Sequence, residues 1–180
     1  MNIENAPIPI RPPKPPRPWP DRIALIIATG FGAGKLPYAP GTWGSGLALV
    51  YGWWILEYHG WQALNAMIAL FILLGLWAAH RHAIITGQAD AGEVVVDEFV
   101  GQWIALLPLA TLTLTNQRWL DFALAFLLFR LFDIWKPWPI RMIDRRMKGA
   151  MSVMLDDVIA GLMAGIIVAV AGVFLAGMNL

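Results

Sequence analysis

The sequence contains no cysteine, and this absence excludes several kinds of chemistry at once. Without a thiol the chain can form no disulfide framework, no thiolate metal site and no cysteine phosphatase centre. Histidine is also scarce, with only three residues. His80 and His82 have no acid–base partner nearby in the sequence, and His59 follows a different hydrophobic run. We interpret all three as interfacial residues and not as nucleophiles.

Charge is the second scarcity, because Asp, Glu, Lys and Arg together make up only 14% of the chain. Hydrophobic residues account for 58%, and the mean hydropathy is +0.61. These values lie outside the range of ordinary soluble domains and indicate an integral membrane protein. Ten tryptophans fit this class, since tryptophan is enriched where a membrane meets water. The net charge of +1 favours no nucleic-acid partner.

The hydrophobic residues are gathered into long runs separated by short polar segments. The main runs cover residues 47–56, 61–79, 99–114, 119–135 and 153–180. Residues 61–79 carry no charge and are long enough to cross a bilayer as a helix. We therefore predict an all-α fold, an integral membrane bundle of about four to five hydrophobic helices. Residues 21–180 form its single domain, and the proline-rich basic segment 1–20 is expected to be a disordered tail.

The positions of the basic residues predict how this bundle is oriented. With the N-terminal segment in the cytoplasm, nearly every Lys and Arg lies inside or at an inner helix end, and Arg118 is the exception. The same arrangement brings the polar clusters of residues 30–46, 80–98 and 136–152 to the cytoplasmic face. We expect the functional site at that face.

Acidic residues recur at the helix ends that meet there. Asp97 and Glu98 open one hydrophobic run, Asp133 lies near the end of another, and Asp156 and Asp157 lie near the start of the last. Taken alone, Asp97 and Glu98 suit the positive end of a helix dipole. Adjacent aspartates near membrane depth are functional candidates. Together the five carboxylates would suit Mg²⁺, which prefers oxygen ligands.

Cations accompany these acids. Arg130, Asp133 and Lys136 recur every three residues, so they share one stripe if this run is helical. An ion network that holds the end of a helix explains the stripe equally well. Beside a metal site, however, Arg130, Lys136 and Arg141 would supply the charge that binds a phosphate. Metal-binding acids next to cations are typical of metal-assisted phosphoryl transfer or hydrolysis.

A glycine-rich segment, residues 30–46, is a further candidate for phosphate binding. Its backbone N–H groups, with Gly32 and Gly34 among them, could face an anion near Lys35 and Thr42. The spacing matches no Walker lysine motif. From its residues alone the segment is better explained as a tight turn between helices.

Four ordered motifs resemble those of the phosphatidylglycerophosphatase A family. They are Gly30-Phe31-Gly32-Ala33-Gly34 with Pro40-Gly41-Thr42-Trp43-Gly44, Val96-Asp97-Glu98-Phe99-Val100-Gly101, Phe129-Arg130-Leu131-Phe132-Asp133 with Lys136-Pro137-Trp138-Pro139-Ile140, and Asp156-Asp157-Val158-Ile159-Ala160-Gly161. The resemblance extends from about Thr29 to Gly165. The proline-rich N-terminal segment departs from the family pattern.

The resemblance implies an all-helical, Mg²⁺-dependent lipid phosphatase that converts phosphatidylglycerophosphate to phosphatidylglycerol. The expected location is the bacterial cytoplasmic membrane. Asp97, Asp157 and Lys136 are the expected catalytic residues, with Asp97 or Asp157 as general base or as metal ligand. Attack by water and an aspartyl-phosphate intermediate both stay open.

Two other functions agree with parts of the same pattern. A membrane transporter for a divalent cation would also need buried carboxylates, but it would not need the accompanying cations. A non-catalytic protein that binds anionic lipid would need the cations, but it would not need five acids.

Overall fold

The computed structural model describes residues 18–88, 91–147 and 149–178. This part of the chain contains helices and no strands, which confirms the predicted all-α class. Its helices are α1 (Trp19–Ala28), η2 (Ala33–Lys35), α2 (Pro40–Thr86), α3 (Val96–Leu106), η3 (Leu107–Ala110), α4 (Arg118–Trp135), α5 (Ile140–Arg146) and α6 (Ala150–Met178). Residues 1–17 of the expected tail lie outside the described residues. The last two residues of that predicted segment belong to α1, which begins at Trp19.

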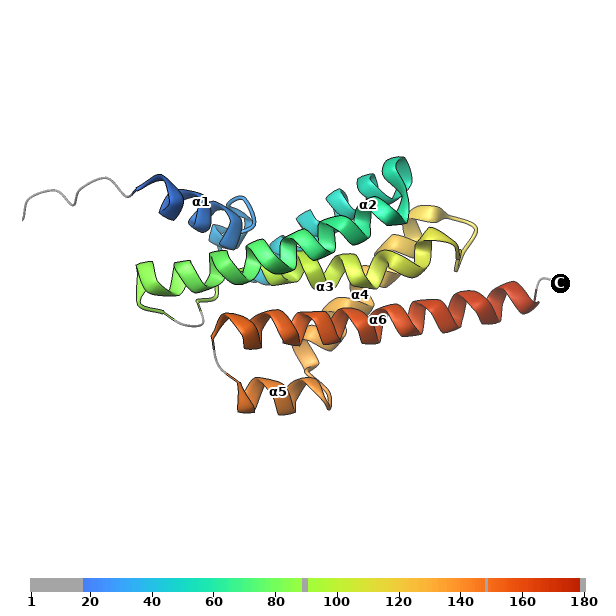
Figure 1. Ribbon diagram of the computed structural model, residues 1–180. Coiled ribbons are helices and arrows are strands. Elements are labelled where there is room, and N and C mark those ends of the chain that lie inside the picture. The colour runs from blue at the N-terminus through green and yellow to red at the C-terminus, as the bar shows by residue number, and fades with distance from the viewer. Residues whose placement is uncertain (1–17, 89–90, 148, 179–180) are drawn as a thin grey trace, which may run out of the picture.

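Helix α2 is a helical hairpin. Gly60 has a φ of 81° and interrupts the helix, and the chain reverses direction at the right-hand end of Figure 1. The sequence predicts a turn at residues 57–60, so this reversal agrees with it. The first limb, residues 40–59, is longer than the hydrophobic run 47–56 because Pro40 occupies the first helical turn, where it needs no hydrogen bond. At 1.5 Å per residue this limb is about 30 Å long.

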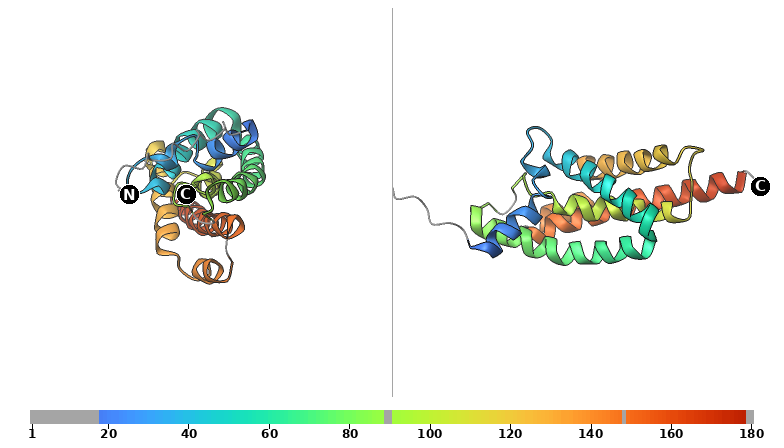
Figure 2. Two further views of the ribbon diagram at one scale, coloured as in Figure 1. Left: turned by 90° about the vertical axis from the view of Figure 1, so that its left-hand side faces the viewer. Right: turned by 90° about the horizontal axis from the view of Figure 1, so that it is seen from above.

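The two limbs of α2, α3 with η3, α4 and α6 lie roughly along one axis and form an elongated bundle (Figures 1 and 2). Helix α5 is short and lies beside the first turns of α6, outside the main bundle (Figure 1). The chain therefore runs back and forth between two ends, as the hydrophobic runs predict. The segments before α3, after α4 and before α6 all lie near the end from which α3 starts.

Helix α3 forms the centre of this bundle. Ten of its residues are buried, from Val96 to Leu106 with only Ile104 partly exposed. The indole Nε1 of Trp103 donates a 2.8 Å hydrogen bond to the carbonyl of Ala48 in α2. On the other side, a side chain at Gly161 of α6 would collide with the backbone of Gly101. Gly161, with Gly165 one turn later, therefore lets the two helices touch, and small residues at this spacing favour such close packing.

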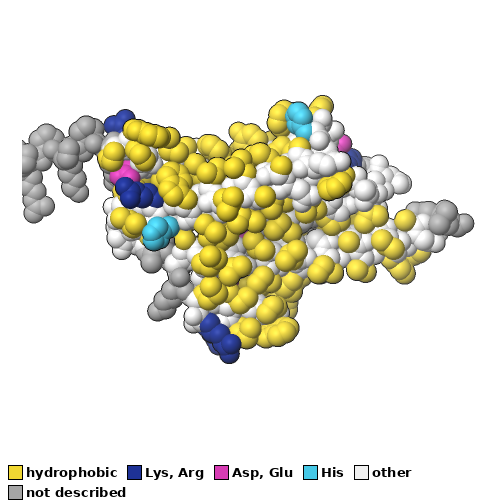
Figure 3. Space-filling view, in the orientation of Figure 1, with side chains coloured by type: hydrophobic (Ala, Val, Ile, Leu, Met, Phe, Trp, Pro, Cys, Tyr) yellow, Lys and Arg dark blue, Asp and Glu magenta, His cyan; other side chains and the backbone are white. Residues whose placement is uncertain are grey.

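The face of the bundle seen in Figure 3 is strongly apolar. Along α6, Ile166, Val170 and Phe174 recur every four residues and are more than 60% exposed, at 61%, 64% and 66%. In the described part of the chain, α2 and α6 are long and apolar enough to cross a membrane. These features are compatible with a membrane protein. The predicted number of four to five crossings stays a prediction.

Candidate active site

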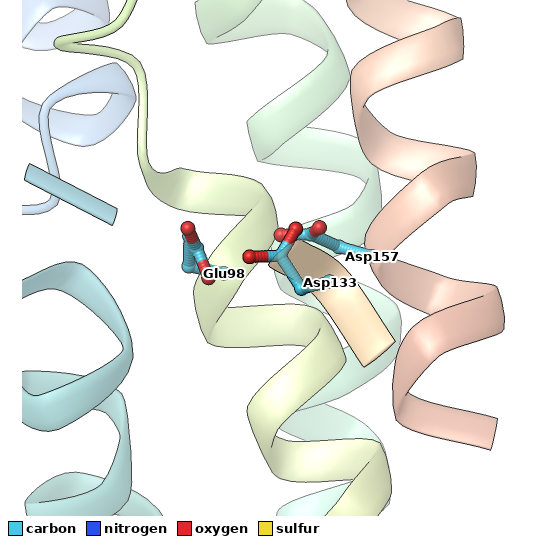
Figure 4. A group of neighbouring side chains, drawn as sticks. All are labelled: Glu98, Asp133 and Asp157. Atoms are coloured by element: carbon cyan, nitrogen blue, oxygen red, sulfur yellow. The ribbon is translucent and has the colours of Figure 1, made fainter. Parts of the chain in front are cut away.

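Three acidic side chains from three different helices meet at one end of α3. Oxygen atoms of Glu98, Asp133 and Asp157 lie within 4.8 Å of one another. Figure 4 shows their carboxylates converging from α3, α4 and α6. Glu98 and Asp157 are buried and Asp133 is half-buried. The structure thus brings together three of the five acids that the sequence nominates as metal ligands.

Backbone packing places these acids. Glu98 lies in the first turn of α3, and Asp133 lies near the end of α4, which stops when Lys136 adopts a left-handed conformation with a φ of 45°. Asp157 lies in the buried face of α6 that includes Gly161. A side chain at Gly101 would come within 2.6 Å of the Asp157 carbonyl. The absence of that side chain allows Asp157 to approach Glu98.

Arg130 is the counter-charge inside this group. Its Nη1 donates to both carboxylate oxygens of Glu98, at 2.8 and 2.6 Å, and lies 2.7 Å from Oδ2 of Asp133. Its Nη2 makes a longer contact of 3.4 Å with the hydroxyl of Thr42. One guanidinium therefore pairs two of the three acids, and the predicted stripe of Arg130 and Asp133 is formed as an ion pair.

Ser45 belongs to the same site, although the sequence did not single it out. Its buried hydroxyl lies 2.6 Å from Oε2 of Glu98, 2.8 Å from the carbonyl of Gly41 and 3.2 Å from Arg130 Nη1. A side chain at Gly41 would collide with the Glu98 carboxylate. Ser45 lies one helical turn after Gly41 in α2, so the two residues share one face of the helix. This spacing is the signal that could have identified Ser45.

The close approach of these carboxylates is electrostatically unfavourable, because Arg130 alone does not balance their negative charge. Burial raises the pKa of Glu98 to about 8, and the neighbouring carboxylates of Asp133 and Asp97 act in the same direction. Arg130 and the Ser45 hydroxyl act in the opposite direction but do not outweigh burial. A bound cation would remove this excess of negative charge, because it favours the ionised form of each carboxylate.

Lys136 and Asp156 form a separate ion pair beside the three acids. Lys136 Nζ lies 3.0 Å from Oδ2 of Asp156 and 3.2 Å from Oδ1 of Asp144. Lys136 thereby connects the end of α4 to α5 and α6. Asp144 was not among the candidates from the sequence. The adjacent aspartates thus differ: Asp157 joins the three-acid group, whereas Asp156 contacts a lysine, and its predicted role as a metal ligand stays a prediction.

The remaining residues that the sequence nominates make different contacts. Asp97 is buried beside Glu98 and acts electrostatically on it. Thr42 contacts Arg130, as described above. Gly34 packs against the backbone of Glu93, Gly32 is in the same loop, and Lys35 is exposed. This loop therefore packs against the segment that leads into α3, and its predicted contact with phosphate stays a prediction.

Arg141 lies in the first turn of α5. Its Nη2 donates a 3.4 Å hydrogen bond to the carbonyl of Trp135, and its side chain lines a cavity at α5.

His82 has an acidic partner that the sequence did not reveal, and its expected place at the membrane interface stays a prediction. Its side chain is buried with 1% exposure, and Nε2 lies 2.8 Å from Oε1 of Glu93. The partner is eleven residues away in sequence and approaches only because the loop after α2 folds back. This contact helps to hold the segment that leads into Asp97 and Glu98.

Comparison with known proteins gives a consistent result. The family model described as Phosphatidylglycerophosphatase A matches residues 26–172. The chain is 41% identical over 143 residues to Phosphatidylglycerophosphatase A of Escherichia coli K12, covering 79% of this chain and 80% of that protein. The Haemophilus influenzae Rd protein of the same name is 38% identical over 143 residues, covering 79% of this chain and 85% of the relative.

A third relative carries a different name. A Bacteroides thetaiotaomicron protein, provisionally named as a phosphatidylinositol-3-phosphatase, is 42% identical over 159 residues. The match covers 84% of this chain and 95% of that protein. No solved structure shows a significant match.

Proposed function

The chain belongs to the phosphatidylglycerophosphatase A family, and on this premise we propose that it hydrolyses phosphatidylglycerophosphate to phosphatidylglycerol and inorganic phosphate. The observation that carries the proposal is the group formed by Glu98, Asp133 and Asp157 beside Arg130. Acids for a metal next to a cation for an anion form the minimum set for metal-assisted hydrolysis of a phosphate ester.

The proposed cofactor is Mg²⁺. Three carboxylates whose oxygens lie within 4.8 Å of one another carry more negative charge than Arg130 balances, so their donor set fits a hard divalent cation. Glu98, Asp133 and Asp157 would hold it, and Asp97 and Asp156 are the further proposed ligands. When bound, the metal would polarise the phosphate ester and lower the pKa of a water molecule.

The chain's own residues then bind and orient the substrate. Arg130 fixes Glu98 and Asp133 through Nη1, while its Nη2, whose contact with Thr42 is long, is the proposed donor for a phosphate oxygen. Lys136 supplies a second positive charge near Asp156. Asp97 or Asp157 accepts the proton of the attacking water. Fixed donors of this kind stabilise charge on the phosphoryl oxygens in the transition state.

We further propose that the protein resides in the bacterial cytoplasmic membrane with the acid group facing the cytoplasm. The apolar helices α2 and α6 support membrane insertion. Lys136, Arg145 and Arg146 lie in the segment between α4 and α6, and basic residues favour the cytoplasmic side. The substrate would then reach the site from the inner leaflet.

The test is phosphate release by the purified full-length protein in detergent. Phosphatidylglycerophosphate should be hydrolysed in Mg²⁺, and activity should be lost in a chelator and restored by Mg²⁺. Ca²⁺ should substitute poorly because it prefers a larger, looser coordination shell. Full activity after exhaustive chelation would contradict the metal-dependent mechanism. Absence of any phosphate release would favour cation transport or lipid binding.

The same assay separates the second candidate activity, which rests on the name of the Bacteroides relative. Phosphatidylinositol 3-phosphate should be a poor substrate beside phosphatidylglycerophosphate at equal surface concentration. A preference for the inositol lipid would replace the proposed substrate and would leave the proposed chemistry intact.

A further inference from the structure

A second cationic region lies between the end of α4 and the start of α6. A cavity of about 550 Å³ opens here, and its lining includes Trp135, Trp138, Arg141, Arg145 and Arg146. Both tryptophans are largely exposed, at 62% and 76%. Figure 3 shows basic side chains at the lower corner of the molecule, where Figure 1 places α5, with hydrophobic side chains beside them.

Positive charge is in excess at this cavity. The three arginines are exposed, and no acid is among the described residues that line it. Asp144 on the same short helix contacts Lys136 at 3.2 Å and also interacts electrostatically with Arg145. Arg141 donates to a neutral backbone carbonyl. One nearby carboxylate, shared with a lysine, does not neutralise three guanidinium groups.

The geometry points to a binding site for the phosphodiester headgroup of an anionic glycerophospholipid, which is held here without being hydrolysed. Guanidinium groups bind phosphate oxygens in a planar, paired geometry. Exposed tryptophans are enriched at the depth of lipid headgroups. The acid group around Glu98 needs a bound cation before it can attract a phosphate, whereas this cavity presents positive charge directly.

Several observations favour a lipid over a soluble anion. Helix α5, which supplies most of the cavity lining, packs against α6, whose outward side chains are apolar and whose length suits a membrane crossing. Trp135 and Trp138 offer apolar surface that free phosphate cannot use. The proposal does not depend on which phosphate ester the enzyme cleaves. Lys136 joins the two regions, because it contacts Asp144 of α5 and Asp156 of α6.

Binding without turnover tests this site. Full-length protein in a nonionic detergent and a chelator would be titrated calorimetrically with short-chain phosphatidylglycerol. Short-chain phosphatidylcholine and inorganic phosphate would be titrated in parallel. Phosphatidylglycerol should bind more tightly than both. Arg145→Gln and Arg146→Gln should each weaken its binding about fivefold, the effect expected for one basic residue at an anionic membrane surface.

Two controls make the result specific. Arg22→Gln removes an exposed charge from α1 and should leave the affinity for phosphatidylglycerol unchanged. Asp133→Asn alters the acid group and should also leave it unchanged. Circular dichroism would verify that each variant is folded, and Trp138→Ala provides a second, uncharged test of the cavity.

Three outcomes would overturn the proposal. These are wild-type affinity in all the cavity variants, an equal loss in Arg22→Gln, or phosphate binding as tight as that of the lipid. Loss of binding in Asp133→Asn would place the lipid at the acid group instead. Because no hydrolysis is measured, a negative result here is distinct from failure of the proposed phosphatase activity.

Discussion

Gly161 of α6 lies so close to Gly101 of α3 that a side chain at position 161 would collide with the Gly101 backbone, and a side chain at position 101 would collide with the Asp157 carbonyl and the Phe129 ring. This contact lies one turn beyond Asp157 in α6 and less than one turn beyond Glu98 in α3. The distance between two of the three clustered acids is therefore set by a backbone contact. A small change in the separation of these helices is expected to affect the site directly.

Gly161→Ala should reduce both activity and stability. The added methyl group must push α6 away from α3, and overpacking of this kind costs about 1–3 kcal/mol. Gly177→Ala is the matched control in the same helix, because a side chain there meets nothing within 4 Å. Thermal unfolding and phosphate release would be measured on both variants. Normal activity in Gly161→Ala would show that the contact does not control the acid group.

The two adjacent aspartates of α6 should respond differently to neutral replacements. Asp157→Asn should lower the turnover by more than about 100-fold and abolish stabilisation by Mg²⁺, because it removes a proposed metal ligand. The metal-free variant should melt at or above the wild-type temperature, since repulsion among the acids is relieved. Asp156→Asn should destabilise the protein by about 1–3 kcal/mol, because it weakens the hydrogen-bonded pair with Lys136, and as a further proposed ligand it should lower the turnover less than Asp157→Asn.

Melting curves with and without Mg²⁺, combined with initial rates, would separate these two roles. An equal loss of stability in both variants would contradict the distinction between them. Unchanged rates in both would remove the aspartates from the active site.

Ser45→Ala should lower the rate about tenfold with a smaller effect on folding. The substitution removes the 2.6 Å hydrogen bond to Glu98. Of the two side chains, Ser45 and Arg130, that hold this carboxylate, Arg130 then remains. Thr113→Ala, which removes an exposed hydroxyl between η3 and α4, is the control. If the affinity for Mg²⁺ and the rate both stay at wild-type values, Ser45 does not orient Glu98.

The stability of the metal-free protein should fall as the pH rises. Burial raises the pKa of Glu98 in the folded protein to about 8, from an ordinary value of 4.5. Between these two values the folded protein retains a proton that the unfolded chain has lost, so a rising pH favours unfolding. The melting temperature in a chelator should therefore fall between about pH 5 and about pH 8, because the protein must give up the proton on Glu98 when it unfolds.

Glu98→Gln is the control for the pH experiment, because it cannot ionise and should remove the contribution of Glu98 to the pH dependence. Addition of Mg²⁺ to the wild type should raise the melting temperature most at the alkaline end, where the cation displaces the proton. An identical pH profile in the variant would show that Glu98 is not the responsible group.

The proposed orientation can be tested by labelling, since the natural chain has no cysteine. Gln88→Cys and Met147→Cys should react with an impermeant thiol reagent only from the cytoplasmic side. Asn116→Cys, in the loop at the other end of the bundle, should react only from the opposite side. Reaction of residues 88 and 116 from the same side would contradict the predicted path of α3.

The sequence predicted the helical class and the turn near Gly60 because hydrophobic runs and a glycine report directly on local structure. It also predicted that acids on different runs would meet, because the runs alternate in direction. It could not predict that Asp157 and Asp156 take different partners. That difference depends on the rotation of α6 relative to α3, which is set by contacts such as Gly101 with Gly161.

Contacts between segments that are distant in the sequence could not be predicted either. Glu93 approaches His82 and Ser45 approaches Glu98 only after the chain has folded back on itself. Lys136 was expected to bind phosphate, yet its place between Asp144 and Asp156 depends on α5, a helix too short to be evident from hydrophobic periodicity.

The dispersal of the acid group along the chain has a consequence for how the protein is made. Glu98 and Asp133 are synthesised before α6, and Arg130 can pair with both as soon as α3 and α4 have met. Asp157 arrives only with the last helix. Before α6 is made, the chain therefore holds only part of the acid group, with Arg130 offsetting one of the two negative charges, and the group is completed when α6 packs against α3 at Gly101.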